Sequence, residues 1–295
     1  MSVVLDELVK LLTLEPIEEN LFRGQSQDLG WGTVFGGQVI GQALSAAVQT
    51  VPRERPVHSL HAYFLRPGDV TRPVLYQVAR VRDGGSFTTR NVIAVQHGEA
   101  IFTLSASFQI TEPGFEHQVA MPKAPPPASV LTDQERLAPF SARFPQKMRE
   151  GFAANQTFEL RIVGPEKDPF SPQPQPAHRQ MWMKANGSLP DDQALHAYLL
   201  AYVSDRNFLP TSLLPHGVTW LSGTMQVASL DHAMWFHQPA RVDEWLLHAM
   251  ESPEAHGARG LVRGQIFSRD GRLIASTTQE GLIRQRETRD TFGPR

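Results

Sequence analysis

Three polar side chains stand out because each lies in an otherwise apolar part of the sequence. Asp205 follows the run AYLLAYV, Ser229 lies in MQVASLDH, and Gln279 lies in STTQEGLI. A carboxylate can accept a proton, and a hydroxyl and an amide can orient a reactant, so these residue types could support general-base chemistry. Each also has a structural explanation, as a turn-forming Asp, a hydroxyl bonded within a sheet and a solvent-facing amide. The residues alone leave this choice open.

The sequence lacks the motifs of several other reaction classes. It contains no cysteine, which excludes disulfides, thiolate nucleophiles, Cys-ligated zinc and iron–sulfur clusters. It has neither the Gly-x-Ser-x-Gly motif of serine hydrolases nor a P-loop, and Phe35 stands where a dinucleotide-binding motif has its third glycine. The 11 histidines form no His-Glu-x-x-His motif, and His58 and His61 would lie on opposite faces of a strand. We predict no cofactor and no metal site.

The elements that would position the three residues follow the same order in each half of the chain. In the first half, a mostly apolar helix follows Gly36 and Gly37, and residues 57–110 read as an antiparallel meander. In the second half, Asp191 or Asp192 caps a helix that ends before Asp205, and four more strand candidates follow. The predicted class is α+β.

Two segments of the first half are also similar in amino-acid sequence to two segments of the second half. SLHAYFLRP is similar to SLDHAMWFHQP, and EAIFTLSASFQI is similar to RLIASTTQEGLIR, in each case roughly 170 residues later. A period of this length predicts two duplicated domains rather than a solenoid. The proline-rich stretch between them reads as a linker, which gives domains at 1–115 and 156–295 and a linker at 116–155.

Charge and hydropathy limit the cellular setting and the partners. The 28 Lys and Arg nearly balance the 30 Asp and Glu, so the chain has no global field that would attract nucleic acid. The first 16 residues read as an amphipathic helix rather than a signal peptide, and no run of about 18 apolar residues could span a membrane. We predict a cytoplasmic protein without a nucleic-acid partner or a membrane span.

The chain resembles acyl-CoA thioesterase II, a family of bacterial and peroxisomal acyl-CoA hydrolases built from two fused hotdog domains. The resemblance covers most of the chain, and the matching segments occur in the same order. They are LFRGQS, VFGGQVIGQAL, VHSLHAYFLRPGD, ARVRDGGSFTTR, YVSDRNFLPTSL, SLDHAMWFH, DEWLLHAMES, ARGLVRGQIFSRDG and ASTTQEGLIR. It implies a double hotdog, each domain an antiparallel sheet wrapped around a central helix. Because fusion replaces a dimer of single domains, we expect the two sheets to join edge to edge and the chains to form a homo-oligomer.

The resemblance also implies a site and a reaction. The family's catalytic Asp, hydroxyl residue and Gln fall on Asp205, Ser229 and Gln279, although the family often has threonine at the hydroxyl position. A water molecule held by these three side chains would hydrolyse fatty acyl-CoA to a free fatty acid and CoA, with Asp205 as the base. The sequence itself suggests the oxyanion donors, which would be backbone N–H groups near Gly36 and Gly37 at the start of the first-half helix, although these glycines could equally serve helix packing.

Two other functions fit the same fold. Hotdog hydratases and dehydratases pair a similarly placed Asp with a His that lies five residues later, after Asn-Pro. Here Phe208 replaces that proline and Pro210 occupies the histidine position, so the second acid–base group is missing. A non-catalytic acyl-CoA-binding protein is the other alternative, but regulators of this kind usually add a basic DNA-binding element, which the sequence lacks.

Overall fold

The protein forms one curved antiparallel sheet with helices packed against one of its faces. Its structure is a computed structural model, and it describes residues 2–165 and 168–286. The strands are β1 (Glu15–Glu18), β2 (Leu21–Gly24), β3 (Val57–Phe64), β4 (Val74–Asp83), β5 (Phe87–Gln96), β6 (Glu99–Gln109), β7 (Phe158–Ile162), β8 (His178–Ala185), β9 (Met225–Ser229), β10 (Asp231–Phe236), β11 (Leu246–His256), β12 (Arg259–Ser268) and β13 (Leu273–Gln285). The α-helices are α1 (Val3–Leu12), α2 (Gly36–Val48), α3 (Asp133–Leu137), α4 (Gln146–Ala154) and α5 (Gln193–Ser204). Short 3₁₀ turns are η1 (Pro127–Ser129), η2 (Ala138–Arg143), η3 (Leu209–His216) and η4 (Trp220–Ser222).

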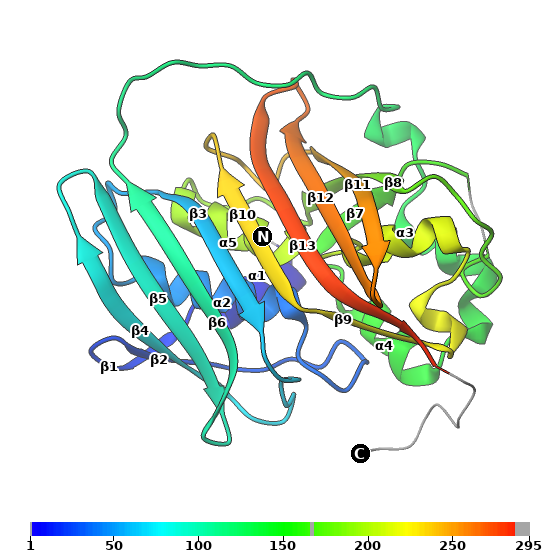
Figure 1. Cartoon of the computed structure of the whole chain (residues 1–295), viewed down its shortest axis with the longest axis horizontal. Helices are drawn as coiled ribbons and strands as arrows, with labels where there is room; N and C mark the ends of the chain where they lie inside the picture. The colour runs from blue at the N-terminus through cyan, green and yellow to red at the C-terminus, as the bar shows by residue number, and fades with distance from the viewer. Residues whose placement is uncertain (1, 166–167, 287–295) are drawn as a thin grey trace.

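The order of the strands is nearly the same when it is read from either edge of the sheet. The first half contributes β1-β2-β4-β5-β6-β3, and the second continues with β10-β13-β12-β11-β8-β7. The halves meet where β3 pairs with β10, with Ser59 opposite Trp235 and Tyr63 opposite Asp231 (Figure 1). β3 and β10 belong to the two segments of similar sequence. Their pairing joins the two halves edge to edge, which confirms the predicted junction. It removes one exposed edge from each sheet.

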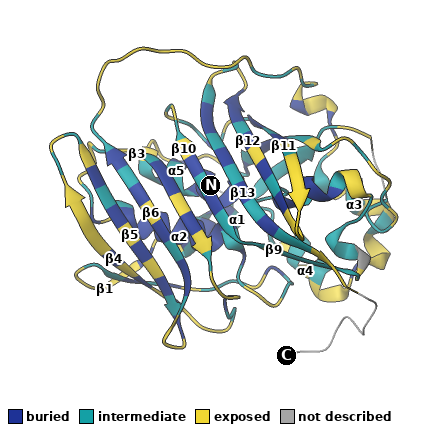
Figure 2. Cartoon of the chain, viewed as in Figure 1, coloured by how far each residue is buried: buried dark blue, intermediate teal, exposed yellow. Residues whose placement is uncertain are grey.

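The central helices α2 and α5 run antiparallel to each other, and both pack against the sheet. α2 is buried from Gly37 to Ala47, because its apolar residues recur on nearly every side and the sheet covers most of them. A Cβ on Gly37 would lie 2.2 Å from the Tyr202 carbonyl oxygen, so only glycine permits this approach to α5. The Asp192 side chain caps α5 by accepting the N–H groups of Ala194 and Leu195, as predicted. Figure 2 shows the buried positions concentrated in the central strands and helices.

The segment MQVASLDHAMWFH is one of the four strand candidates predicted for the second half, and it forms two strands, β9 and β10. β9 places Ser229 opposite Gly281 of β13, whereas β10 places Ala233 opposite Thr278, which shifts the register by one residue between them. The Asp231 carboxylate accepts the Glu280 backbone N–H at this point, at 2.6 Å. Such a bulge re-aims side chains relative to the sheet. The bulge lies directly beside Ser229.

The proline-rich segment is not a bare linker, because it contains α3 and α4 and contacts both halves. The Trp182 indole N–H donates to the Pro125 carbonyl, and Arg161 donates to the carbonyls of Pro127 and Val130. A Cβ on Gly151 of α4 would lie 2.2 Å from the Leu29 carbonyl oxygen. This segment therefore packs tightly on the molecule, while the predicted boundaries 1–115, 116–155 and 156–295 stay a prediction.

Candidate active site

The structure brings Asp205, Ser229 and Gln279 together from three separate elements. Asp205 is the C-cap of α5, Ser229 ends β9, and Gln279 lies in the middle of β13. The Gln279 Nε2 donates to Ser229 Oγ at 2.6 Å, and the Gln279 side chain also hydrogen-bonds the Asp205 carboxylate. Asp205 and Ser229 line the large cavity, whereas Gln279 is completely buried behind them.

The surroundings of Asp205 oppose its ionisation. Desolvation raises the pKa of Asp205 above its ordinary value, while nearby His232 and the Gln279 hydrogen bond pull it back down. The backbone N–H of Gly37 and the Arg206 guanidinium act in the same downward direction. The net pKa of Asp205 remains raised. A carboxylate with a raised pKa is a stronger proton acceptor than an exposed one.

The two glycines at the start of α2 have different surroundings. The Gly37 N–H is bonded to the Asp205 carboxylate, so this donor holds the acid in place. A Cβ on Gly36 would lie 2.7 Å from Asp205 Oδ2, which places Gly36 against the same carboxylate. The packing role considered for these glycines applies to Gly37, which contacts α5. Their predicted oxyanion role stays a prediction, and only the Gly36 N–H remains a candidate for it.

A cavity of about 1850 Å³ opens beside these residues. Its apolar wall combines aromatic side chains of the first half with residues of the second half and η3, among them Trp31, Phe64, Phe158 and Leu209. Residues of α3 and α4 complete the wall, so the proline-rich segment belongs to the site. The sequence contained one signal for α3, since Thr132 and Glu135 have the spacing of a capping box and form one.

Basic side chains line part of the same cavity. They are Arg66, Arg136, Arg149, Arg179, Arg206 and Lys147. The Arg206 guanidinium stacks over the Phe35 ring, at 4.6 Å from its centroid. Burial lowers the pKa of Arg179 to about 10 and raises that of Asp133 to about 6, and each charge partly offsets the other's shift. The cavity thus combines a long apolar surface with positive charge.

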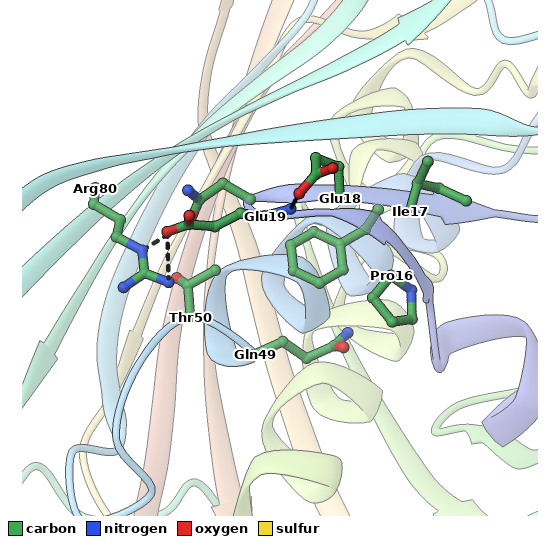
Figure 3. Close-up of a pocket in the computed structure, with 9 residues that line it drawn as sticks. Pro16, Ile17, Glu18, Glu19, Gln49, Thr50 and Arg80 are labelled. Carbon is green, nitrogen blue, oxygen red and sulfur yellow. Dashed lines mark hydrogen bonds and ion pairs between the residues drawn. The ribbon is translucent and has the colours of Figure 1, made fainter.

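The opposite end of the helix pair lacks the same arrangement. The C-cap of α2 is Gln49, an amide, whereas the C-cap of α5 is Asp205. The nearby pocket, of about 360 Å³, is lined by Gln49, Thr50 and the β1–β2 hairpin (Figure 3). Glu19 and Arg80 form an ion pair there, with 3.9 Å between Oε1 and Nη2. Among the residues that the structure describes, we therefore place the candidate site at the Asp205 end of the helix pair.

Within the described residues, no group of three or more His, Asp or Glu side chains has an arrangement that could hold a metal ion. Across the same residues, no helix combines the length and the apolar character needed to cross a bilayer.

Comparison with known proteins places the chain in a family. The family model for acyl-CoA thioesterase matches residues 151–282, and the model for the acyl-CoA thioesterase N-terminal domain matches residues 26–109. Acyl-CoA thioesterase 2 of Haemophilus influenzae is 47% identical over 284 residues, which cover 96% of this chain and 99% of that protein.

Solved structures agree with these sequence matches. The crystal structure of an acyl-CoA thioesterase II from Mycobacterium marinum is 43% identical and superposes with a TM-score of 0.76, covering 94% of this chain and 98% of that one. A hotdog-fold protein of unknown function from Alicyclobacillus acidocaldarius, 23% identical, has the same TM-score of 0.76 over 94% of this chain and 98% of its own, and supports the fold alone. The chain therefore belongs to the acyl-CoA thioesterase II family, whose members are thioester hydrolases with a double hotdog fold.

Proposed function

We propose that this protein hydrolyses fatty acyl-CoA to a free fatty acid and CoA, using a water molecule activated at Asp205. The observation that carries this proposal is the bonded group of Asp205, Gln279 and Ser229 at the wall of the large cavity. The reaction needs a proton acceptor beside a space that can hold a long acyl chain. This site supplies both.

In the proposed reaction, the water oxygen adds to the thioester carbonyl carbon while one of its protons passes to the Asp205 carboxylate. The tetrahedral oxyanion then collapses and the carbon–sulfur bond breaks. The departing CoA thiolate takes up the proton, which returns Asp205 to its ionised form. The acyl group gains the hydroxyl oxygen and the sulfur gains the proton, so the step balances.

Ser229 and Gln279 have different parts in this scheme. The Ser229 Oγ accepts a hydrogen bond from the Gln279 amide, so its own proton is free to point toward the water or the oxyanion. Gln279 is fully buried and bonds both Ser229 and Asp205. We assign to Ser229 direct contact with the reacting atoms and to Gln279 the alignment of its two neighbours. This refines the expectation that all three touch the water.

The Gly36 N–H is the proposed oxyanion donor. It is the first N–H of α2, where backbone donors are free of intrahelical partners and the helix dipole favours negative charge. The basic residues of the cavity wall suit the phosphates of CoA, while the aromatic residues suit the acyl chain. Release of free thiol from purified protein and a chain-length series of acyl-CoA substrates tests the function. Binding without thiol release would instead support an acyl-CoA-binding protein.

We further propose that the protein acts in the cytoplasm as a homo-oligomer of double-hotdog chains. The 47% identity to a bacterial relative and the near-neutral charge are compatible with this setting. Sedimentation at two protein concentrations would give the oligomeric state.

Gly36→Ala should reduce turnover without unfolding the protein. The added methyl would lie 2.7 Å from Asp205 Oδ2, so the carboxylate must move away from the position in which it accepts the proton. We expect kcat to fall by roughly 10- to 100-fold, because small displacements of catalytic groups have effects of this size. Gly85→Ala, in a turn where a Cβ would meet nothing within 4 Å, is the matched control. Unchanged turnover in Gly36→Ala would contradict the placement of Asp205.

The pH dependence of kcat/KM should have an acid limb set by Asp205. Protonated Asp205 cannot accept a proton, so activity should be lost as pH falls through its pKa in the folded protein. Burial raises that pKa, so the midpoint should lie above the value of about 3.9 for an ordinary aspartate. A pH–rate profile, with circular dichroism at each pH to verify folding, measures it.

Asp133 provides the control for this profile. It lines the same cavity and burial raises its pKa to about 6, so it could produce a similar limb. Asp133→Asn should leave the limb in place if Asp205 is the base. Loss of the limb in that variant would assign it to Asp133.

A further inference from the structure

Behind the proposed catalytic group lies a buried histidine that the reaction scheme does not use. His232 is completely buried in β10, where alternate residues face the helices. Its Nδ1 lies 2.7 Å from Gln279 Oε1, and its Nε2 lies 3.0 Å from the Ser204 hydroxyl. The ring therefore joins Gln279 to the last residue of α5, the neighbour of Asp205.

These contacts determine which ring nitrogen carries the proton. In the structure the Gln279 Oε1 faces His232 Nδ1, and an amide oxygen only accepts, so in this orientation of the amide Nδ1 is the donor. The Ser204 hydroxyl then donates to Nε2 of the neutral ring in place of the Ala201 carbonyl, which lies 2.9 Å away. Burial, which lowers the pKa of His232, favours this neutral form.

The ring tautomer and the orientation of the Gln279 amide are therefore linked. An amide can rotate by 180° and exchange its oxygen and nitrogen positions. With the ring donating, the rotated amide would place N–H against N–H at His232 and its oxygen against the Asp205 carboxylate. Both contacts would be repulsive, and both groups are buried. Only the observed orientation gives Ser229 and Asp205 a donor.

We propose that His232 is a positioning residue, which through its Nδ1–H fixes the Gln279 amide so that Gln279 donates to Ser229 and Asp205. This inference rests on the proposed function, because it assigns to His232 an effect on the proton acceptor and on the hydroxyl group. His232 touches neither the water nor the thioester.

The test compares two substitutions of nearly the same shape. Asn can place an N–H near the position of Nδ1, whereas Leu cannot donate. We expect His232→Leu to lower kcat by roughly tenfold or more, the size found when groups that orient a catalytic ligand are removed, with KM nearly unchanged. His232→Asn should recover most of that loss. Equal activity in the Leu and Asn variants would overturn the proposal.

A double-mutant cycle separates positioning from a structural role. In a Gln279→Ala background, His232→Leu should have less than about a threefold further effect on kcat, because the amide that it orients is gone. Fully additive effects would contradict the proposal. Should His232→Leu fail to fold, Ser204→Ala, which removes the donor to Nε2, should still lower kcat, and wild-type turnover in that variant would count against the proposal.

The pH profile supplies a further readout. The charged or titratable groups around His232 are Asp205 from α5, Asp231 on its own strand and His248 from β11. Removing His232 frees the Gln279 amide, whose hydrogen bond lowers the pKa of Asp205, so the acid limb should move to higher pH in His232→Leu. An Asp205→Asn variant measured in the same series keeps the two proposals apart. If it retains activity, the proposed function fails, whereas if it alone loses activity, only the role of His232 fails.

Discussion

Asp205→Asn is expected to lower kcat by at least about 100-fold while the protein remains folded, because the substitution removes the proton acceptor and little else. Asn has nearly the same shape as Asp and can still accept the Gly37 N–H that holds the carboxylate in place. It cannot take a proton from water at neutral pH. Near wild-type turnover in a folded variant would exclude Asp205 as the base.

The melting temperature of this variant should stay the same or rise. Asp205 has a raised pKa, so its ionised form is disfavoured in the folded protein. For such a group, the contribution to the free energy of unfolding decreases as pH rises through the folded pKa. Neutral Asn avoids that cost. A large fall in melting temperature with little change in kcat would indicate a structural residue instead.

A matched control lies at the other end of the same helix. Asp192 caps the N-terminus of α5, and Asn is an equally good capping residue. Asp192→Asn should therefore change neither kcat nor the melting temperature appreciably. The two substitutions make the same chemical change at the two ends of one helix, but Asp205 lines the cavity, whereas Asp192 is exposed and lies away from it.

Local patterns in the sequence predicted most of the fold. The helix that ends at Asp205 was predicted from the Asp192 cap and its apolar run, and it forms as Gln193–Ser204. Period-two alternation predicted the meanders, and the sequence similarity within two pairs of segments predicted the duplication. These signals are local, or compare one segment with another. They can be read without knowing which elements pack against each other in the folded protein.

Tertiary packing determined what the sequence analysis missed. His232 and His61 lie in strands of similar amino-acid sequence, yet His232 is fully buried and His61 is exposed. Strand alternation alone does not tell which face is inside, and the bulge at Asp231 changes the facing after Ser229. The many prolines led us to predict a linker without helices where α3 and α4 form, although the Thr132 capping box marked the start of α3. Gly37 was predicted at the site, but its bond to Asp205 depends on how α2 meets α5.

Gln279→Ala should have the second largest effect on kcat, a loss of about 100-fold, and the effect should overlap with that of Asp205. Truncation removes the amide that bonds both Ser229 and Asp205, so neither group keeps its orientation. It also leaves the buried His232 Nδ1–H without its acceptor, which should cost about 1–3 kcal/mol of stability. Steady-state kinetics and thermal unfolding of the same preparation measure both changes.

Combined variants decide whether the three residues work as a unit. If Asp205 and Ser229 act on one water and Gln279 aligns them both, Gln279→Ala or Ser229→Ala added to Asp205→Asn should cost much less than it does in the wild-type background. Ser229→Thr is the matched control, because it keeps the hydroxyl that accepts from Gln279 and adds only a methyl group. It should retain most of the activity. Additive losses in the double variants would mean that Gln279 and Ser229 stabilise the fold or bind substrate independently of Asp205, and the shared-water mechanism would then be wrong.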